Sequence, residues 1–483
     1  MAITEKSIAR GQADALFRPR SIAVIGASSD ATRIGGRPID YTRRGNYAGA
    51  LYPINPNQRE VQGLPCFPSI AAVPGEVDLA LIALPARAAP QAVDECLAKG
   101  VRAIVMFSSG FAEIDAAGRA VQDEMLKRCQ AAGVLLLGPN CLGLMNIGTG
   151  MLLTFSTVLE SIWPHQGQVS VVSQSGAVGA YAAALAMERG IGLSQWVSTG
   201  NEADIDVAQC IQWLAEDDAT GTIMAYLEGC RNVPALRSAL QAAARNGKPV
   251  LLLKSGVTDT GRNAVALHTG SDAGDDNAYA EIFRATGAFR ARSIEQQVDM
   301  AYACANGVFP RGPRLCVITI SGGVGVLTAD AARAAGLELP PPGLVAQREI
   351  KQLVPFSSAL NPVDVTAQIV NDISLFNRIL TLVAQEQVFD SIIIFLQQLG
   401  KVDRHFHGFR DAMLEARGNQ PEKLFVLCGG YSAENRAEME AAGFLVFEDP
   451  SRAAAAVSGL TRISLDLGKT GNKAGSTSRQ KKS

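Results

Sequence analysis

Residues 169–179, VSVVSQSGAVG, and residues 315–325, LCVITISGGVG, decide how the fold is interpreted. In each stretch an apolar run, typical of a buried parallel strand, passes into a Ser-Gly-x-Val-Gly turn. An alanine-rich helical stretch follows, ending at Gly190 in the first copy and at Gly336 in the second. Two copies of one strand–turn–helix unit predict two similar, flavodoxin-like α/β domains.

A further group of strands is expected before these two units. Five apolar runs are each followed by a turn and most by a helical stretch, and they cover residues 21–25, 50–56, 79–85, 103–107 and 134–137. Such a succession predicts a doubly wound, Rossmann-like domain. The predicted domains are therefore 1–145 (Rossmann-like), 146–300 and 301–465 (both flavodoxin-like), with a basic tail at 466–483 whose Gly, Ser, Lys and Asn content predicts disorder.

Composition narrows the class of protein. A chain of 483 residues is too long for one hydrophobic core, so about three domains are expected. The net charge of −2 gives no reason to expect nucleic acid or an anionic membrane as a partner. The nine cysteines form no C-x-x-C pair, and the N-terminal stretch is polar, which fits a cytoplasmic protein with reduced thiols. No run reaches the roughly 18 apolar residues of a membrane span.

His268 is the first candidate for chemistry. It stands in Leu-His-Thr-Gly-Ser, after the apolar run 249–253, and a loop rich in Gly, Ser, Thr and Asp is expected to carry it beyond the carboxyl end of a strand. A neutral imidazole nitrogen can attack phosphorus or an acyl carbon and leave again. A surface or structural histidine is the alternative. Thr269 and Gly270 favour a nucleophile, because their N–H and hydroxyl groups can bind an oxyanion.

Two further features point to the same edge of the sheet. Ser175 and Gly176 open a helix whose free N–H groups and positive dipole end can bind a phosphate. A serine in that place is also a common helix N-cap with no ligand. Glu228 follows the apolar run 221–227, where it is either a solvated carboxylate or a hydrogen-bond partner that stabilises a charged histidine.

The first domain carries a glycine turn, GAS at 26–28, directly after its first strand, 21–25. This place suits a nucleotide-like ligand, although the spacing is not G-x-G-x-x-G. The second strand leads to Asn55 rather than to an acid, which argues against a nicotinamide-dependent dehydrogenase, since an acid there binds the ribose. His405 and His407 have no third ligand nearby in the sequence, so no metal site is expected.

Twelve short motifs occur in one order along the chain: FRPRSIAVIGAS, YPINP, VDLALIALPA, SSGFAE, GPNCLGLMN, SQSGAVG, STGNEADID, YLEG, HTGSDAG, SGGVGVLTAD, NPVDVT and FEDPSRA. Any one of them alone is a weak signal, but the ordered set is specific. From about residue 16 to residue 458 the chain resembles the NDP-forming acyl-CoA synthetases, which are relatives of succinyl-CoA synthetase. The resemblance is to their α-type, CoA-binding and phosphohistidine-bearing portion.

The resemblance implies a reaction that passes through a phosphorylated histidine. A phosphoryl group would move between a nucleoside triphosphate, His268 and a carboxylic acid, and the thiol of coenzyme A would then attack the acyl phosphate to form a thioester. Glu228 would stabilise the phosphohistidine. The phosphate would lie at Ser175, Gly176, Thr269 and Gly270. Coenzyme A would lie across the first domain at Gly26, Ala27, Ser28, Asn55, Pro85, Ser108, Ser109, Gly110, Phe111 and Asn140. Such transfer depends on positioned donors more than on acid–base groups.

The chain departs from the family pattern near the histidine. Leu267 stands where the family usually has Ser, and Asp272 stands where it has a small or apolar residue, which adds negative charge. No stretch resembles the family's ATP-grasp module, and no G-x-x-x-x-G-K-[ST] motif replaces it. A separate ATP-grasp (β-type) subunit is therefore expected to supply ATP/ADP and Mg in a homo- or hetero-oligomer. A non-catalytic CoA-binding or regulatory protein on the same scaffold is the alternative.

Overall fold

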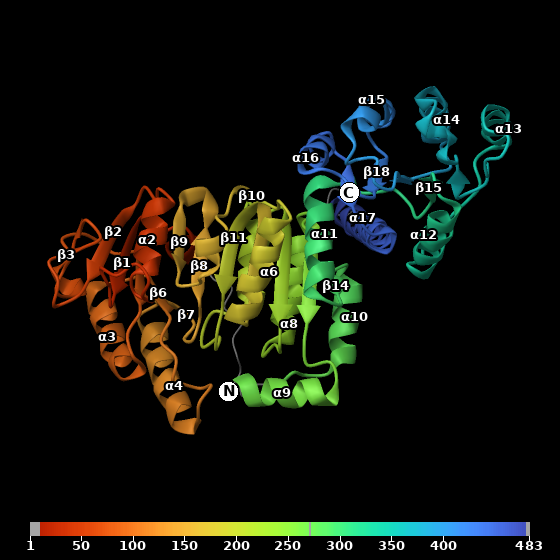
Figure 1. Ribbon diagram of the computed structural model, residues 1–483. Helices are drawn as coiled ribbons and strands as arrows, with labels where there is room; N and C mark the ends of the chain where they lie inside the picture. Colours follow the sequence, from red (N-terminus) through yellow and green to blue (C-terminus); the bar gives the residue numbers. More distant parts are fainter. Residues whose placement is uncertain (1–9, 270–271, 480–483) are drawn as a thin grey trace. The chain divides into compact units, whose positions relative to one another are not determined.

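The computed structural model of the protein describes residues 10–269 and 272–479, apart from the side chains of residues 10, 268–269 and 469–479. The chain forms two compact units, Met1–Ala301 and Tyr302–Ser483. The first unit contains two large sheets and the second contains one (Figure 1). No helix in the described ranges is both long enough and apolar enough to cross a membrane.

The first sheet consists of five parallel strands in the order β2-β1-β5-β6-β7. Its strands are β1 Ser21–Ile25, β2 Ala50–Ile54, β5 Leu79–Ile82, β6 Ala103–Met106 and β7 Leu135–Leu137, with a small ribbon of β3 Glu60–Val61 and β4 Leu64–Pro65. Its helices are α1 Arg10–Phe17, α2 Arg37–Arg44, α3 Ala89–Lys99 and α4 Ala116–Ala131. The apolar runs are buried because both faces are covered, with α3 and α4 on one of them.

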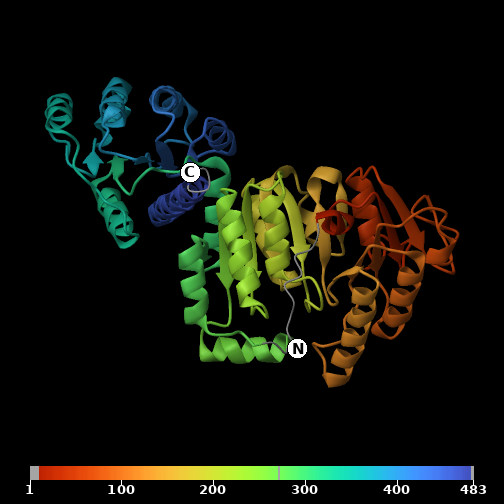
Figure 2. The ribbon, with the colours of Figure 1, turned by 180° about the vertical axis from the view of Figure 1, so that it is seen from behind.

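The second sheet has seven strands in the order β14-β13-β12-β10-β11-β8-β9. Its strands are β8 Gly143–Asn146, β9 Met151–Thr154, β10 Gln166–Ser173, β11 Leu193–Ser198, β12 Thr222–Leu227, β13 Val250–Lys254 and β14 Phe289–Ala291. Its helices are α5 Val158–Ser161, α6 Gly176–Glu188, α7 Val207–Glu216, α8 Val233–Arg245, α9 Asp259–Thr269, α10 Asp276–Thr286 and α11 Ile294–Asn306. Helix α6 lies on one face of the sheet (Figure 1), and α7 and α8 lie on the other (Figure 2).

The two sheets of the first unit share one hydrophobic core. Buried residues of β1, β5 and β6 belong to the same cluster as buried residues of β10, β12 and helix α7. Phe17 of α1 stacks on Trp213 of α7 with ring centroids 4.0 Å apart. Asn146 Nδ2 donates to the Phe17 carbonyl over 2.9 Å. Loops that follow the strands of one sheet are therefore held in a fixed place relative to loops of the other.

The third sheet forms the second unit and is all parallel, in the order β16-β15-β17-β18-β19. Its strands are β15 Leu315–Thr319, β16 Val363–Asp364, β17 Ser391–Phe395, β18 Leu424–Cys428 and β19 Leu445–Phe447. Its helices are α12 Gly322–Ala334, α13 Leu344–Leu353, α14 Ile373–Gln385, α15 Asp403–Asn419, α16 Ala433–Ala441 and α17 Pro450–Arg479. Helices α13 to α16 supply the apolar side chains packed on one face.

Helix α17 differs from the expectation for the tail. The stretch from 466 was predicted to be disordered, whereas the helix continues to Arg479; residues 480–483 lie outside the described part of the chain. The helix starts in an apolar segment with Ala453, Val457 and Leu460 buried. Once a packed helix has formed, each further residue adds one backbone hydrogen bond at little cost, and this favours extension into a polar stretch.

All three sheets use the same strand order. If the parallel strands of each sheet are numbered along the chain, the order is 2-1-3-4-5 three times, which is the flavodoxin-like doubly wound arrangement. The second sheet, which contains β10, and the third sheet, which contains β15, thus match in topology as well as in the sequence of their strand–turn–helix segments. Strand β8 spans the predicted limit at 145 and already belongs to the second sheet. The exact domain limits stay a prediction.

Candidate functional site

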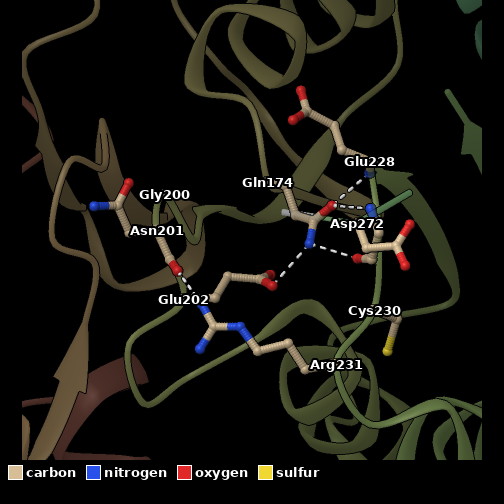
Figure 3. A pocket seen from close by; sticks show the side chains of 9 residues that line it. Gln174, Gly200, Asn201, Glu202, Glu228, Cys230, Arg231 and Asp272 are labelled. Atoms are coloured by element: carbon tan, nitrogen blue, oxygen red, sulfur yellow. Dashed lines mark hydrogen bonds between the residues drawn. The ribbon is translucent and has the colours of Figure 1, made fainter. Parts of the chain in front are cut away.

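A cavity of about 150 Å³ lies at the carboxyl edge of the second sheet (Figure 3). Strands β10 and β12 are neighbours there although β11 comes between them in the sequence, so the chain direction across the sheet reverses. Such a switch point is where open α/β sheets bind ligands. The lining residues are Gln174, Gly200, Asn201, Glu202, Glu228, Gly229, Cys230, Arg231 and Asp272.

Gln174 follows β10 directly and its side-chain amide ties three loops together (Figure 3). Its Nε2 donates to Glu202 Oε2 over 2.7 Å and to the Gly229 carbonyl over 2.7 Å. Its Oε1 accepts from the backbone N–H of Glu228 and, over 3.2 Å, from that of Gly229. Both ends of the amide are used, so the turns after β11 and β12 are fixed against the end of β10.

Glu202 brings a buried carboxylate into the cavity, with 7% of the residue exposed. Besides the bond from Gln174, its Oε1 accepts from Thr199 Oγ1 and from the Val207 N–H, each over 2.9 Å. Burial, and secondly repulsion from Asp206, raise its pKa from 4.5 to about 7. Hydrogen bonds to the charged form oppose this rise without cancelling it. The fold therefore favours the protonated, neutral form of this carboxyl group more than water does.

Glu228 lies at the end of β12, as the sequence predicted, and is buried. Its Oε1 accepts from Tyr226 Oη over 3.3 Å, and its carboxylate points away from the Gln174 amide (Figure 3). Lys254, also buried, donates from Nζ to the Glu228 carbonyl over 2.8 Å, and burial lowers the pKa of that ammonium group. The end of β12 is thus held by a cation on β13 and by the amide of Gln174.

The segment that carries His268 was predicted to be a loop, and this prediction was wrong for most of its length. Helix α9 runs through Asp259–Thr269, so the backbone of His268 lies in its last turn. Residues 263–267, NAVAL, are mostly good helix formers, and their propensity outweighed the flanking Gly and Thr. The side chains of His268 and Thr269, and all of Gly270, lie outside the described part of the chain.

The chain returns to the cavity at Asp272. A Cβ atom on Gly229 would come within 2.3 Å of the Asp272 carbonyl oxygen, so the two backbones are in close contact and glycine is required there. Asp272 Oδ1 accepts from the Gly274 N–H over 2.9 Å. The structure therefore brings the segment just after His268 against the end of β12, next to Glu228.

Ser175 and Gly176 begin helix α6, as predicted. Ser175 accepts a bond from the Val178 N–H over 3.4 Å, so it acts as the helix N-cap. A Cβ atom on Gly176 would meet a terminal methyl of Leu142 at 1.8 Å, so a larger residue here would displace that side chain. From this turn it is Gln174 that lines the cavity. A phosphate-binding role for Ser175 and Gly176 remains a prediction.

The residues predicted to contact coenzyme A gather at the carboxyl edge of the first sheet. Asn55 Nδ2 donates to the Ala27 carbonyl over 2.8 Å, and Ser108 Oγ donates to the Leu84 carbonyl over 2.5 Å. The Asn140 N–H donates to the Ser108 carbonyl over 2.9 Å. These bonds join the loops after β1, β2, β5, β6 and β7, which also carry Gly26, Ser28, Pro85, Ser109, Gly110 and Phe111.

Sequence reasoning missed four polar side chains of the cavity, namely Gln174, Asn201, Glu202 and Arg231, besides Gly200, Gly229 and Cys230. Each follows a buried strand within a few residues, and a polar side chain in that place was a usable signal. The sequence does not show which strands are neighbours. In the sheet β10 lies between β11 and β12, so residues that follow all three strands meet at the cavity.

Two family models match the chain: a CoA binding domain at residues 20–147 and a succinyl-CoA ligase like flavodoxin domain at residues 166–304. Over 460 residues the chain is 32% identical to subunit alpha of the ADP-forming acetate–CoA ligase II of Pyrococcus furiosus, covering 94% of this chain and 98% of that protein. The chain belongs to the NDP-forming acyl-CoA synthetase family. It is also 35% identical over 455 residues to the ADP-forming acetate–CoA ligase I of Archaeoglobus fulgidus, of which it spans 63%.

Solved structures agree with this assignment to the synthetase family. An acetyl-coenzyme A synthetase of Ca. Korarchaeum cryptofilum, in complex with phosphate and ADP, matches with a TM-score of 0.85 and 31% identity, covering 95% of this chain and 98% of that one. A Pyrococcus horikoshii protein matches with a TM-score of 0.78 and 29% identity, covering 94% and 99%. The predicted α/β fold, with a CoA-binding domain followed by a flavodoxin-like domain, and the predicted kinship to ligases are confirmed.

Proposed function

We propose that this chain is the α-type subunit of an NDP-forming acyl-CoA synthetase. It forms or cleaves the thioester of a small carboxylic acid through an acyl phosphate and a phosphorylated His268. ATP/ADP and Mg bind to a separate ATP-grasp subunit. Two observations support this division: the P. furiosus relative is named as one subunit, and this chain spans 98% of it.

The placement of the cavity carries the proposal. It lies at the switch point of the second sheet and contains Glu228, the residue expected to stabilise the phosphohistidine. Asp272 lines the same cavity, and it follows His268 by four positions. Four residues span at most about 14 Å. The connection between them therefore keeps the backbone of His268 within that distance of the cavity rim.

The chemistry proceeds in three transfers. In thioester formation, a nitrogen of His268 attacks the γ-phosphorus of ATP and ADP leaves. A carboxylate oxygen of the acid then attacks the phosphorus of the phosphohistidine, and the imidazole leaves as acyl phosphate forms. Finally the sulfur of coenzyme A attacks the acyl carbon, the bond from that carbon to the phosphate oxygen breaks, and orthophosphate and the thiol proton are released.

The residues of this chain position the groups that react. Gln174 fixes the backbone at Glu228 and Gly229, so the wall of the cavity does not have to reorganise when charge moves. The guanidinium of Arg231 and the cap of α6 place positive potential near a phosphoryl group. The loops after β1 and β6 hold coenzyme A on the first sheet, which shares its core with the second.

Phosphorylation of the histidine provides the test. The chain is co-purified with an ATP-grasp subunit from the same genome and incubated with ATP labelled at the γ-phosphate. We expect acid-labile, base-stable label on the wild type and on His165→Asn, an exposed histidine elsewhere in the first unit, and none on His268→Asn. An unlabelled wild-type complex that binds coenzyme A would contradict the proposal and favour a non-catalytic CoA-binding protein.

A further inference from the structure

Asn201 connects loops of two sheets through three side-chain hydrogen bonds, which use both N–H donors and the carbonyl oxygen. It lies in the turn after β11, in the second sheet, and lines the cavity. Its Nδ2 donates to Glu113 Oε2 over 2.5 Å and to Gln122 Oε1 over 3.0 Å. Its Oδ1 accepts from Asn140 Nδ2 over 3.2 Å. All three partners come from the part of the chain that builds the first sheet.

The bond to Glu113 leads to the loop expected to contact coenzyme A. Glu113 accepts from the Gly110 N–H over 2.6 Å and from the Phe111 N–H over 3.2 Å. Burial raises the pKa of Glu113, but these N–H groups and the Asn201 amide outweigh it, and the pKa is held below its ordinary value. The carboxylate is therefore charged at neutral pH. Charge-assisted bonds of this kind are about twice as strong as neutral ones.

The backbone of Asn201 leads in the other direction, into the cavity. Arg231 Nη2 donates to its carbonyl over 2.7 Å, as Figure 3 shows. The next residue, Glu202, is bonded to Gln174, which in turn holds Gly229. Hydrogen bonds, joined by the peptide link between Asn201 and Glu202, therefore connect Gly110 to the end of β12. Gly200 allows this connection, because a Cβ atom there would lie 2.4 Å from the Pro139 carbonyl oxygen.

We propose that Asn201 is a positioning residue that couples the binding of coenzyme A at the Gly110–Phe111 loop to the binding of phosphate in the cavity. This inference rests on the proposed function. Binding of either ligand orders one end of this series of hydrogen bonds. The residues at the other end are then already ordered when the second ligand binds. Coupling of this kind is reciprocal, and it appears as the factor by which one ligand changes the dissociation constant of the other.

Calorimetric titration of the full chain measures this factor directly. Coenzyme A is titrated with and without saturating inorganic phosphate, a pair that does not react. In the wild type we expect saturating phosphate to lower the dissociation constant of coenzyme A by about 5-fold or more. In Asn201→Ala we expect phosphate to change the dissociation constant of coenzyme A by less than about 2-fold, whatever the affinity of either ligand alone. If Asn201 had only a structural role, its loss would weaken the binding of both ligands. The factor by which phosphate changes the dissociation constant of coenzyme A would then stay as in the wild type.

Two further variants make the result decisive. Asn246 directly follows α8, and Asn246→Ala loses one side-chain bond of 2.8 Å, to the Ala215 carbonyl in α7, so it should keep the wild-type factor. Glu113→Gln keeps the shape but loses the charge, and it should reduce the factor even if Asn201→Ala does not fold. A wild-type factor near one, or a factor unchanged in folded Asn201→Ala and Glu113→Gln, overturns the inference. A wild type that binds no coenzyme A overturns the proposed function instead.

Discussion

The second and third sheets have the same strand order and the same Ser-Gly turn, yet they differ in the first residue after each of three matching strands. After β10, β11 and β12 the chain places Gln174, Thr199 and Glu228. After β15, β16 and β17 it places Ile320, Val365 and Leu396. Val365 and Leu396 are buried in the apolar core of the second unit, and Ile320 packs against it. The same edge of the same fold is polar in one sheet and apolar in the other.

Topology supplies the place for a site, and side chains supply its chemistry. Both sheets bring their first and third strands together and point a helix N-terminus at the gap. In both sheets the hydroxyl of the last residue of the first strand donates to the carbonyl two residues later. The bond from Ser173 to Ser175 is 2.6 Å long, and the bond from Thr319 to Ser321 is 2.9 Å long. A polar first residue after the strand is what ties the neighbouring turns into a cavity wall in the second sheet.

Exchanging the first residue after β10 should have the largest effect. Gln174→Ile removes the amide that holds Glu202, Glu228 and Gly229, so the cavity wall loses its fixed geometry. A displacement of about 1 Å can reduce a rate by about 100-fold, and we expect a loss of that size in the rate of His268 phosphorylation. Rapid-quench labelling of the complex measures it. The reciprocal change, Ile320→Gln, is the control. Equal losses from both exchanges would show that the polar edge has no special role.

The buried carboxylate of Glu202 gives the next largest effect, on stability. Its pKa is raised in the folded state from 4.5 to about 7, so between these values the folded chain holds the proton more tightly than the unfolded chain does. The free energy of unfolding therefore decreases as pH rises through this window, by on the order of 3 kcal/mol in total above pH 7. The glutamine of Glu202→Gln does not titrate in this range. We therefore expect the free energy of unfolding of this variant to change less with pH than that of the wild type.

Urea unfolding of the first unit's transition at several pH values from 5 to 9 measures this dependence. Glu124→Gln, which changes an exposed carboxylate on α4, is the matched control and should follow the wild type. A wild-type curve with the same slope as Glu202→Gln would mean that Glu202 stays ionised throughout. In that case the bonds from Gln174, Thr199 and Val207 would outweigh burial.

Much of this comparison could be predicted from the sequence. The repeated strand–turn–helix pattern gave two matching units, because a buried parallel strand followed by a glycine turn is a local signal. The same signal located the residues after the strands of the first sheet. Glu228 was found for the same reason, since it follows an apolar run directly.

The rest could not be predicted because it depends on contacts between distant segments. Asn201 meets Glu113 across 88 positions of the chain, and Gln174 meets Gly229 across 55. No periodicity reports such pairs. The shared core of the two sheets brings Asn201 to Glu113, and the pairing of β10 with β12 brings Gln174 to Gly229. The helix that carries His268 was missed for the opposite reason, since its local propensity was given less weight than its flanking loop residues.

The helix caps provide the smallest and most direct comparison of the two sheets. Ser175 accepts a bond from the Val178 N–H at the start of α6, whereas within the described part of the chain the Ser321 side chain makes no such cap bond at the start of α12. Loss of a bonded serine cap costs about 1 kcal/mol. We therefore expect Ser175→Ala to lower the free energy of unfolding by about that amount and Ser321→Ala to lower it by roughly half or less. Urea denaturation measures both. Equal losses would mean that Ser321 caps its helix in solution, and the two turns would then differ only in their neighbouring Gln174 and Ile320.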